Sequence, residues 1–441
     1  MIGTLKRQAA LFLMAALLLP LIAACGGTGT TTAPTAGTTT DSATTAPAAT
    51  TMVEATAMVE ATTAPEATAM TDATAMTDAT AMTDATAMTD ATAMTDATAM
   101  TFPAMTPRAV TATLTGSGAS FPDPIYQQWV QTYKTLAPNV TINFQSVGSG
   151  QGRKDFFGGV TDFGASDKFA SDDELSKFGK PVYHVPTVLG AVVATYNLKG
   201  ITNLQFSGET LANIFLGKIK TWNDPAIAAD NAGVTLPDAA ITVVHRSDGS
   251  GTTSIWTNYL SSVSPEWKSG PGAGDTVQWP VGQGGEKNPG VAQAVQQTEG
   301  SIGYVELIYA LGNKLPAPKI KNAAGKFVDP TLASVSAAAA AFLPKTPDDL
   351  RANIVNPPAG TPDADAAYPI SGYTWILVNA EMADQNKAQA LTDFLYWSLT
   401  EGQKAAEGLG YAPLPSAVQA KAIAKLSLVK AGGQPAFTMP K

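Results

Sequence analysis

Cysteine and histidine are almost absent from this sequence of 441 residues, and their scarcity excludes several kinds of site. The only cysteine is Cys25, so no internal disulfide can form. The two histidines, His184 and His245, do not lie in motifs with metal-ligand spacing. A phosphatase would need a metal cluster or a nucleophile with its base, and neither pattern is present.

Aromatic and basic residues are absent between Gly26 and Thr101. A unit reading Thr-Ala-Met-Thr-Asp-Ala recurs there, with methionine at every sixth position from Met70 to Met100. This spacing gives neither a helix nor a strand a clean apolar side. Such a segment cannot bury enough surface to offset its chain entropy, so we expect residues 25–108 to form a disordered tether. A methionine-based copper site is the alternative, and the sequence does not decide whether the threonines carry sugars.

The acidity of the chain belongs to this tether. The formal net charge is −9, and the segment without basic residues holds nine acids. Setting these acids and the two early basic residues Lys6 and Arg7 apart leaves −2 for residues 102–441. No basic patch indicates nucleic acid, but a nearly neutral body can bind an anion through local dipoles. The nine acids are Asp41, Glu54, Glu60, Glu66, Asp72, Asp78, Asp84, Asp90 and Asp96.

Residues 1–24 have the pattern of an export signal. Lys6 and Arg7 precede an apolar run, Leu11 to Ile22, which is too short to span a membrane as a mature helix. Two alanines and Cys25 follow the run. The segment Leu21-Ile22-Ala23-Ala24-Cys25 resembles a bacterial lipobox with Cys25 as the lipidated residue. A plain signal peptide with an incidental cysteine, or a buried membrane stub, is the alternative.

An apolar run with strand-like alternation is followed three times by a loop rich in Gly, Ser and Thr and then by a helical apolar pattern. This order predicts α/β architecture with largely parallel sheets. Leu391 to Leu399 predicts a later helix, and Pro415 fits the first turn of a last one. The runs begin near Val110, Val140 and Ile241, and the loops are Gly116–Pro122, Gly148–Gly152 and Arg246–Thr253.

The position of these loops before helices predicts anion binding. A helix N-terminus has unpaired N–H groups and a partial positive charge, glycine allows close approach of a ligand, and hydroxyls add donors. Each loop alone is weak evidence for anion binding, because glycine turns and Ser/Thr caps are common. None matches the nucleotide-binding loop G-x-x-x-x-G-K-[ST].

Charged residues near the loops sharpen the prediction. The guanidinium of Arg246 can bind an oxyanion through two parallel hydrogen bonds, and Asp248 can hold that guanidinium in place. The alternative is that Arg246 and Asp248 form an ordinary surface ion pair. Asp167 beside an anion site can accept a hydrogen bond from a protonated ligand. It can equally be the N-cap of a helix over Phe169–Leu175, and the pattern does not choose between the two.

Six motifs follow one another along the chain: Leu114–Pro122, Asp162–Asp167, Leu216–Trp222, Arg246–Thr252, Gly284-Gly285 and Ile302–Glu306. In this order they resemble the phosphate-binding protein of the high-affinity phosphate ABC transporter, through essentially all of residues 110–430. In two places the sequence departs from that family. Ser120 stands where the family often has Thr, and the second loop has Gly150 where Ser is common.

The resemblance implies a two-lobe periplasmic-binding-protein fold of type II that closes on dehydrated phosphate. We expect residues 109–187 and 370–441 to form lobe 1 and residues 188–369 to form lobe 2. Asp248 would support the site. The implied phosphate contacts are Ala119, Ser120, Phe121, Ser149, Asp167, Arg246, Ser250, Gly251 and Thr252.

The resemblance also implies partners and a location. We expect a monomer, lipid-anchored on the extracytoplasmic side of the cell membrane, that delivers phosphate to the permease subunits of an ABC importer. It implies no cofactor, metal, nucleic acid or catalysis. A binding protein for sulfate or molybdate and, from another class, a phosphatase are the alternatives; Asp167 disfavours sulfate, which has no proton to offer it.

Overall fold

The computed structural model describes residues 102–440. The predicted signal peptide, the lipidated Cys25 and nearly all of the predicted tether lie outside the described residues. The last residues of that tether differ from the expectation, because they lie against the body. The Tyr396 hydroxyl donates to the carbonyl of Pro103 at 2.7 Å, and Arg108 forms an ion pair with Asp393, which is 2% exposed.

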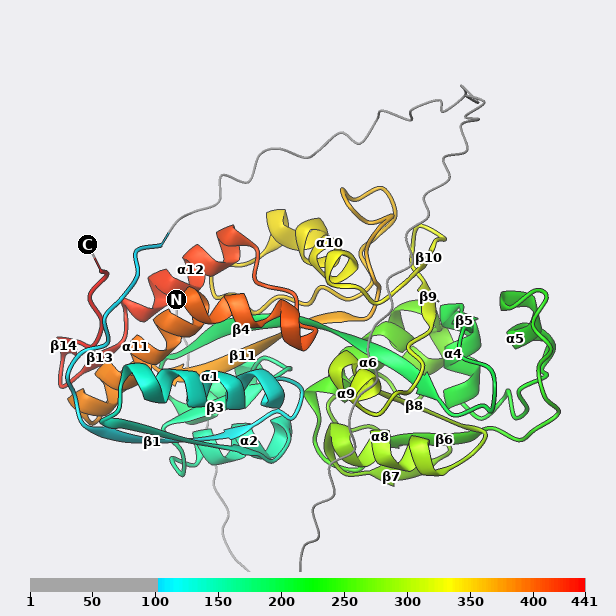
Figure 1. Cartoon of the computed structure of the whole chain (residues 1–441), viewed down its shortest axis with the longest axis horizontal. Helices are drawn as coiled ribbons and strands as arrows, with labels where there is room; N and C mark the ends of the chain where they lie inside the picture. Colours follow the sequence, from blue (N-terminus) through cyan, green and yellow to red (C-terminus); the bar gives the residue numbers. More distant parts are fainter. Residues whose placement is uncertain (1–101, 441) are drawn as a thin grey trace, which may run out of the picture. The chain divides into compact units, whose positions relative to one another are not determined.

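The predicted α/β architecture is confirmed, and its centre is an eight-stranded sheet in the order β2-β1-β3-β11-β4-β8-β6-β7 (Figure 1). Its strands are β1 (Ala112–Gly118), β2 (Val140–Ser146), β3 (Phe163–Ser166), β4 (Val182–Tyr196), β6 (Thr242–Arg246), β7 (Gln283–Gly285), β8 (Ser301–Glu306) and β11 (Ser371–Asn379). The shorter strands are β5 (Gln205–Phe206), β9 (Lys319–Lys321), β10 (Phe327–Val328), β12 (Glu381–Met382), β13 (Lys430–Ala431) and β14 (Gln434–Pro435).

Two long strands join the halves of this sheet. The first part of β4, as far as Ala191, pairs with β11, and from Val192 onward β4 pairs with β8. The chain crosses between the halves in β4 and returns into β11, so these two strands are antiparallel. The outer strands β1, β2 and β3 in one half and β6, β7 and β8 in the other are parallel, as predicted. The sheet is therefore mixed where it crosses.

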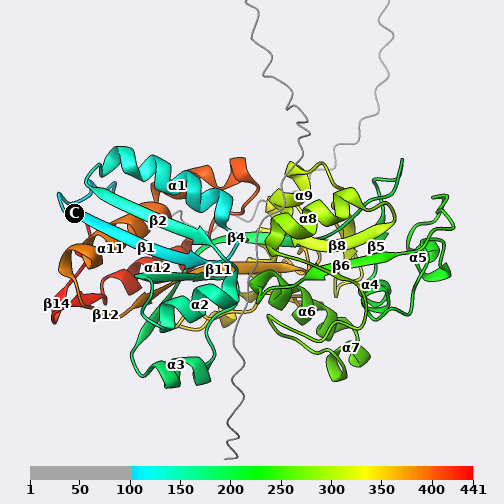
Figure 2. The same ribbon diagram turned by 90° about the horizontal axis from the view of Figure 1, so that it is seen from below.

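The described residues contain twelve α-helices. Right-handed crossovers from β1 to β2 and from β2 back to β3 require α1 and α2 to lie on opposite faces, as Figure 2 shows. The helices are α1 (Asp123–Leu136), α2 (Ser149–Phe157), α3 (Asp172–Phe178), α4 (Gly208–Phe215), α5 (Pro225–Asp230), α6 (Gly251–Val263), α7 (Pro265–Ser269), α8 (Lys287–Gln297), α9 (Leu307–Gly312), α10 (Leu332–Phe342), α11 (Gln385–Leu399) and α12 (Ser416–Leu426).

The apolar helix faces read from the sequence are buried. Ile125 and Trp129 on α1 are fully buried, and so are Trp256 and Tyr259 on α6. An aliphatic side chain such as Ile125 contributes about 1.5–3 kcal/mol by leaving water. Trp256 also stacks on Tyr304 of β8, with ring centroids 5.0 Å apart. These contacts hold α1 and α6 against the sheet. The loops before both helices therefore end at fixed positions.

Two helices begin at residues other than those considered in the sequence analysis. Asp167 is not a helix cap, because α3 begins later, with Ser171 as its N-cap and Glu174 completing a capping box. Pro415 lies one residue before the first turn of α12, at the N-cap position.

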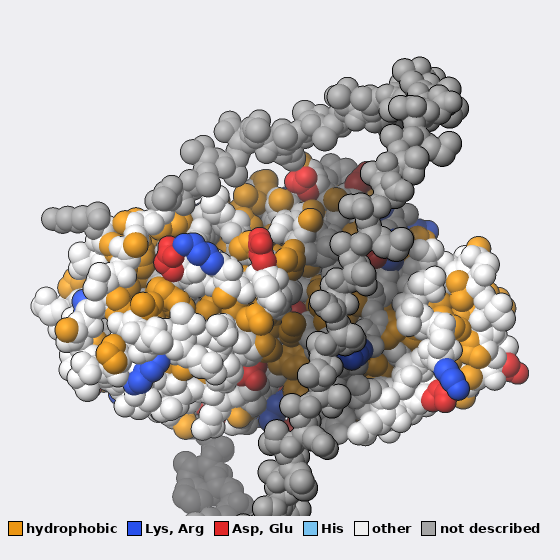
Figure 3. Space-filling model, in the orientation of Figure 1, with side chains coloured by type: hydrophobic (Ala, Val, Ile, Leu, Met, Phe, Trp, Pro, Cys, Tyr) orange, Lys and Arg blue, Asp and Glu red, His pale blue; other side chains and the backbone are white. Residues whose placement is uncertain are grey.

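The surface matches the near-neutral charge of the body. On the face drawn in Figure 3, basic and acidic side chains are scattered, and no broad basic surface forms. Among residues 102–440, no helix has both the length and the apolar character needed to cross a membrane.

Candidate functional site

The three loops singled out in the sequence meet between the halves of the sheet. Because they follow the carboxyl ends of β1, β2 and β6, they place the N-termini of α1, α2 and α6 in one region. The second and third loops touch: the N–H of Gly150 donates to the carbonyl of Gly249 at 2.8 Å. The structure is therefore a closed arrangement of the two halves.

Glycine is required at one point of this contact. A Cβ atom on Gly251 would lie 2.5 Å from Cβ of Asp167 and 2.7 Å from its Cα, closer than such atoms approach in real proteins. Gly251 opens α6 in one half, and Asp167 follows β3 in the other. Only a residue without a side chain allows the two halves to come this close.

Several backbone donors converge here without an acceptor in the described part of the chain. They are the N–H groups of Ser120 and Phe121 after β1, of Ser149 at the start of α2, and of Gly251 and Thr252 at the start of α6. Ala119 differs from the expectation. Its N–H donates to the carbonyl of Ala165 at 2.9 Å and holds the loop to β3, so it offers no donor to a ligand.

Arg246 supplies the positive charge of the site and is 3% exposed. Its guanidinium is held by Asp248, with Nε 2.8 Å from Oδ1 and Nη2 2.5 Å from Oδ2. Burial alone would raise the pKa of Asp248, but the hydrogen bonds from Arg246 lower it below its usual value, so the pair is charged. The remaining nitrogen, Nη1, donates to Thr252 Oγ1 at 3.3 Å. The carboxylate thus fixes the plane of the guanidinium before a ligand arrives.

Asp167 is an acceptor placed among these donors. It is 4% exposed, and its Oδ1 has no hydrogen-bond partner among the described residues. Its Oδ2 accepts from the hydroxyl of Ser149 at 3.2 Å. Burial raises the pKa of Asp167 to about 7, even though the neighbouring Thr374 hydroxyl and the Arg246 charge lower it. Thr374 Oγ1 is itself buried and forms no hydrogen bond of normal geometry with the described residues. A buried, unpaired carboxylate oxygen is costly, and it indicates a missing partner that brings a proton.

Ser250, which was also expected to contact a ligand, caps α6. Its hydroxyl oxygen accepts from the N–H of Thr253 at 3.0 Å, and its own N–H donates to the carbonyl of Asp275 at 2.8 Å. The hydroxyl hydrogen of Ser250 is therefore the group with which this residue can donate to a ligand.

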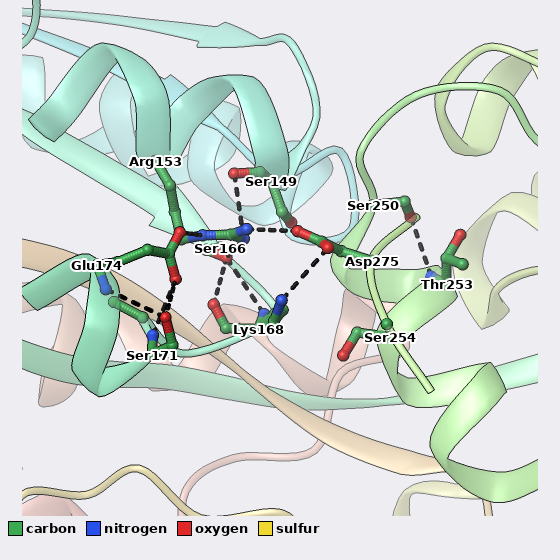
Figure 4. A network of polar contacts seen from close by, with 12 residues as sticks. Ser149, Arg153, Ser166, Lys168, Ser171, Glu174, Ser250, Thr253, Ser254 and Asp275 are labelled. Carbon is green, nitrogen blue, oxygen red and sulfur yellow. Dashed lines mark hydrogen bonds and ion pairs between the residues drawn. The ribbon is translucent and has the colours of Figure 1, made fainter. Parts of the chain in front are cut away.

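A second layer of ion pairs joins the halves beside the three loops (Figure 4), and the sequence did not predict it. Arg153 of α2 forms ion pairs with Glu174 in its own half and with Asp275 in the other. Lys168 reaches the same Asp275, with Nζ 3.3 Å from Oδ1. The cationic partners and Asp275 lie on opposite sides of the contact, so this interaction exists only while the halves are closed. We call Arg153, Lys168 and Asp275 the latch.

Asn288 is another contact that the sequence analysis missed. It lies on α8, is fully buried, and its amide Nδ2 donates to Ser120 Oγ at 3.0 Å and to Thr252 Oγ1 at 3.2 Å. The only signal was its position three residues after the Gly284-Gly285 motif. Tyr309 also crosses between the halves, donating to the carbonyl of Ser120 at 2.5 Å.

Both histidines have structural partners. His184 Nε2 accepts from the N–H of Ala170 at 3.0 Å, and burial lowers the pKa of His184 to about 4, so it is neutral. His245 stacks on Trp279 at 4.8 Å between centroids. The described residues contain no cluster of three or more His, Cys, Asp or Glu side chains arranged to hold a metal.

Comparison with known proteins gives consistent results. The family model described as "PBP superfamily domain" matches residues 29–401. A curated relative in Pasteurella multocida, named "Phosphate-binding protein PstS", is 44% identical over 69% of this chain and 87% of its own length. A relative of the same name in Xylella fastidiosa is also 44% identical, over 71% of this chain and 85% of its own length. A relative of the same name in Methanocaldococcus jannaschii is 39% identical over 74% of this chain and 89% of its own length.

Solved structures show the same fold at lower identity. A phosphate-binding protein from Stenotrophomonas maltophilia is 23% identical, with a TM-score of 0.56 over 71% of this chain and 93% of that one. A human phosphate-binding apolipoprotein is 22% identical, with a TM-score of 0.58 over 73% and 99%. The two-lobe fold predicted from the sequence is therefore confirmed.

We predict that Gly251→Ala prevents the close approach of the halves, because the added methyl overlaps Asp167. With millimolar inorganic phosphate present, since the relatives are named for binding it, the Gly150 amide should exchange its hydrogen at least about tenfold faster in the variant. Gly312→Ala is the matched control, because a Cβ there meets nothing within 4 Å. Equal protection of Gly150 in both variants would contradict the steric argument.

We also predict that pH controls closure of the ligand-free protein. In the closed structure burial raises the pKa of Asp167 above its usual value, to about 7. If opening exposes this carboxyl to water, its pKa falls, so the closed state is favoured at low pH and loses this advantage as pH rises to about 7. The ionisable neighbours that face Asp167 are Arg246, Arg153 and Glu306, and burial raises the pKa of Glu306 well above its usual value. Small-angle scattering should therefore give a smaller radius of gyration near pH 5 than near pH 8.

Asp167→Asn serves as the control for this pH effect, because its side chain does not titrate. The variant should have the same radius of gyration at both pH values. A parent protein whose radius does not change, or a variant that changes as much as the parent, would show that another group is responsible.

Proposed function

The chain belongs to the PstS phosphate-binding proteins of the PBP superfamily, and on this premise we propose that it captures inorganic phosphate between its two halves for an ABC importer. One observation carries the proposal: a buried carboxylate oxygen without a partner, Asp167 Oδ1, lies among donors that have no acceptor in the described residues.

The donors suit a tetrahedral oxyanion. Three helix N-termini contribute N–H groups and partial positive charge, and Arg246 contributes a fixed guanidinium. In a dry cleft these interactions are much stronger than in water, so a site of nearly neutral total charge can hold an anion.

Asp167 selects which oxyanion is held. Phosphate keeps at least one proton near neutral pH, and its O–H can donate to Asp167 Oδ1 in a charge-assisted hydrogen bond of about 1.5–3 kcal/mol. Sulfate has no proton, so it would place a bare oxygen against the carboxylate with no water to screen the charges. A site that pairs a ligand hydrogen rejects the analogue that lacks it. Phosphate is therefore favoured over sulfate and molybdate.

Capture requires the halves to separate and close. We propose that residues 109–187 with 370–441 and residues 188–369 move as two lobes. The change of β4 pairing from β11 to β8 between Ala191 and Val192 supports a boundary in this strand. The latch and the Gly150–Gly249 contact would form on closure, which is the usual way such clefts enclose a ligand.

Location and partners complete the proposal. We propose an export signal in residues 1–24, lipid on Cys25, and a disordered tether that keeps a monomeric body near permease subunits outside the cytoplasm. The lone cysteine directly after an apolar run and the repetitive composition of residues 26–101 support this assignment. The relatives are named as binding proteins, and we propose binding without turnover, with no cofactor.

Calorimetric titration of two variants tests the function. Arg246→Ala should weaken phosphate binding by at least about 100-fold, because it removes a buried charge that faces the anion and leaves Asp248 unpaired. Asp167→Asn should narrow the ratio of phosphate to sulfate affinity, because its amide can donate to an unprotonated oxygen. If the parent protein binds no phosphate, the proposed function is wrong; an unchanged ratio in Asp167→Asn refutes only the role of Asp167.

The latch should act on release. Asp275→Asn removes the charge that attracts Arg153 and Lys168, so we expect phosphate to dissociate about 5- to 50-fold faster, while association changes little. Stopped-flow kinetics measures both rates. Asp173→Asn is the matched control, since its exposed pair with Lys177 lies within one helix. If the two variants release phosphate at the same rate, the latch has no role in closure.

A further inference from the structure

Asn288 occupies a buried position between the groups that face the anion. It belongs to the first turn of α8, directly after Lys287, whose φ of 60° is unusual for a residue with a side chain. In this turn two successive N–H groups point at site residues. The N–H of Lys287 donates to Asp248 Oδ1 at 2.9 Å, and that of Asn288 donates to Ser120 Oγ at 3.2 Å.

The orientation of the Asn288 amide follows from its partners. Its Oδ1 lies 2.9 Å from the backbone nitrogen of Glu306, which can only donate. The atom facing that N–H must therefore be the oxygen, and the NH₂ group must face Ser120 and Thr252. Both hydrogens of the NH₂ group and the oxygen are used.

This orientation sets the direction of two hydroxyl groups. A hydroxyl has two acceptor sites and one hydrogen to donate. Ser120 Oγ accepts from both the Nδ2 and the backbone nitrogen of Asn288. Thr252 Oγ1 accepts from Asn288 Nδ2 and from Arg246 Nη1. Each oxygen is thus saturated as an acceptor, and neither hydroxyl donates to another described residue.

We propose that Asn288 is a positioning residue that makes the Ser120 and Thr252 hydroxyls donate to the bound anion. This inference rests on the proposed function and extends it. Without the amide, each hydroxyl can turn and accept from a neighbour or from water, and its hydrogen then points away from the ligand. A buried donor that is already aimed needs no reorganisation when phosphate enters.

The same side chain links binding to closure. Ser120 follows β1 in one half, whereas Asn288 and Thr252 belong to the other. The Asn288–Ser120 hydrogen bonds therefore exist only in the closed arrangement, and closure itself fixes the Ser120 hydroxyl as a donor. Phosphate would meet the full set of aimed hydroxyls only after the halves come together.

Asn288→Asp in the full chain is the most direct test, because it keeps the shape of the side chain and replaces donors with acceptors. The introduced carboxylate still accepts from Glu306, but it also draws the hydrogens of both hydroxyls away from the anion. Calorimetry at pH 8 should show a Kd for inorganic phosphate at least about 100-fold above that of the parent.

The pH profile separates this role from a structural one. As pH falls, the introduced carboxyl gains a proton and recovers one donor, so the ratio of variant to parent Kd should shrink between pH 8 and pH 5. Asn288→Ala cannot titrate, so its ratio should stay constant over the same range.

Asn231→Asp is the matched control for the loss of a buried amide. Asn231 is 5% exposed and donates to the carbonyls of Gln205 and Ile227, away from the three loops. This variant should lower the melting temperature, as Asn288→Asp should, without changing the phosphate Kd.

A double-mutant cycle decides the matter if Asn288→Asp does not fold. Asn288→Ala should raise the Kd at least about tenfold in the parent, but clearly less in a Ser120→Ala background, because one of the hydroxyls through which it acts is gone. Equal factors in the two backgrounds overturn the proposal, and so does a parent-like Kd in Asn288→Asp. Absence of phosphate binding in the parent would instead refute the proposed function.

Discussion

The whole site depends on one unsatisfied atom, the buried Oδ1 of Asp167. A carboxylate oxygen without a partner in a closed cleft is unfavourable until a ligand supplies a hydrogen. The features proposed to face the anion are donors: helix N-termini, hydroxyls and the Arg246 guanidinium. An acceptor among these donors fits an anion that still has a proton, so under the proposed function the same geometry would account for both binding and selectivity.

The fold produces this arrangement by bringing together strand ends from separate parts of the chain. Parallel strands in each half direct their following loops to one edge, and β4 and β11 hold the two edges opposite each other. Buried tryptophans fix α1 and α6 on the sheet, so the N-termini of both helices keep their positions at the site. Glycine at position 251 then allows the backbones to meet without a side chain between them.

Much of this was readable from sequence because it is local. A strand, a Gly/Ser/Thr loop and a helix are contiguous, and so is the Arg246–Asp248 pair, so their chemistry is visible in a few residues. Together with the family resemblance, such motifs were enough to predict the two-lobe fold.

The contacts that were missed join distant residues. Arg153 and Asp275 are 122 positions apart, and Ser120 and Asn288 are 168 apart. Only the packing of the two halves makes them neighbours. The backbone contact of Ala119 is another such pairing, because its N–H donates to the carbonyl of Ala165 in β3.

A single competition titration of the parent protein tests the central claim most directly. Calorimetry at pH 8 would measure phosphate binding first alone and then in a large excess of sulfate at constant ionic strength. The account predicts the same phosphate Kd in both solutions, because Asp167 excludes an anion that has no proton to donate. A phosphate Kd that rises in proportion to the sulfate concentration would contradict it, since sulfate would then occupy the same donors despite the carboxylate.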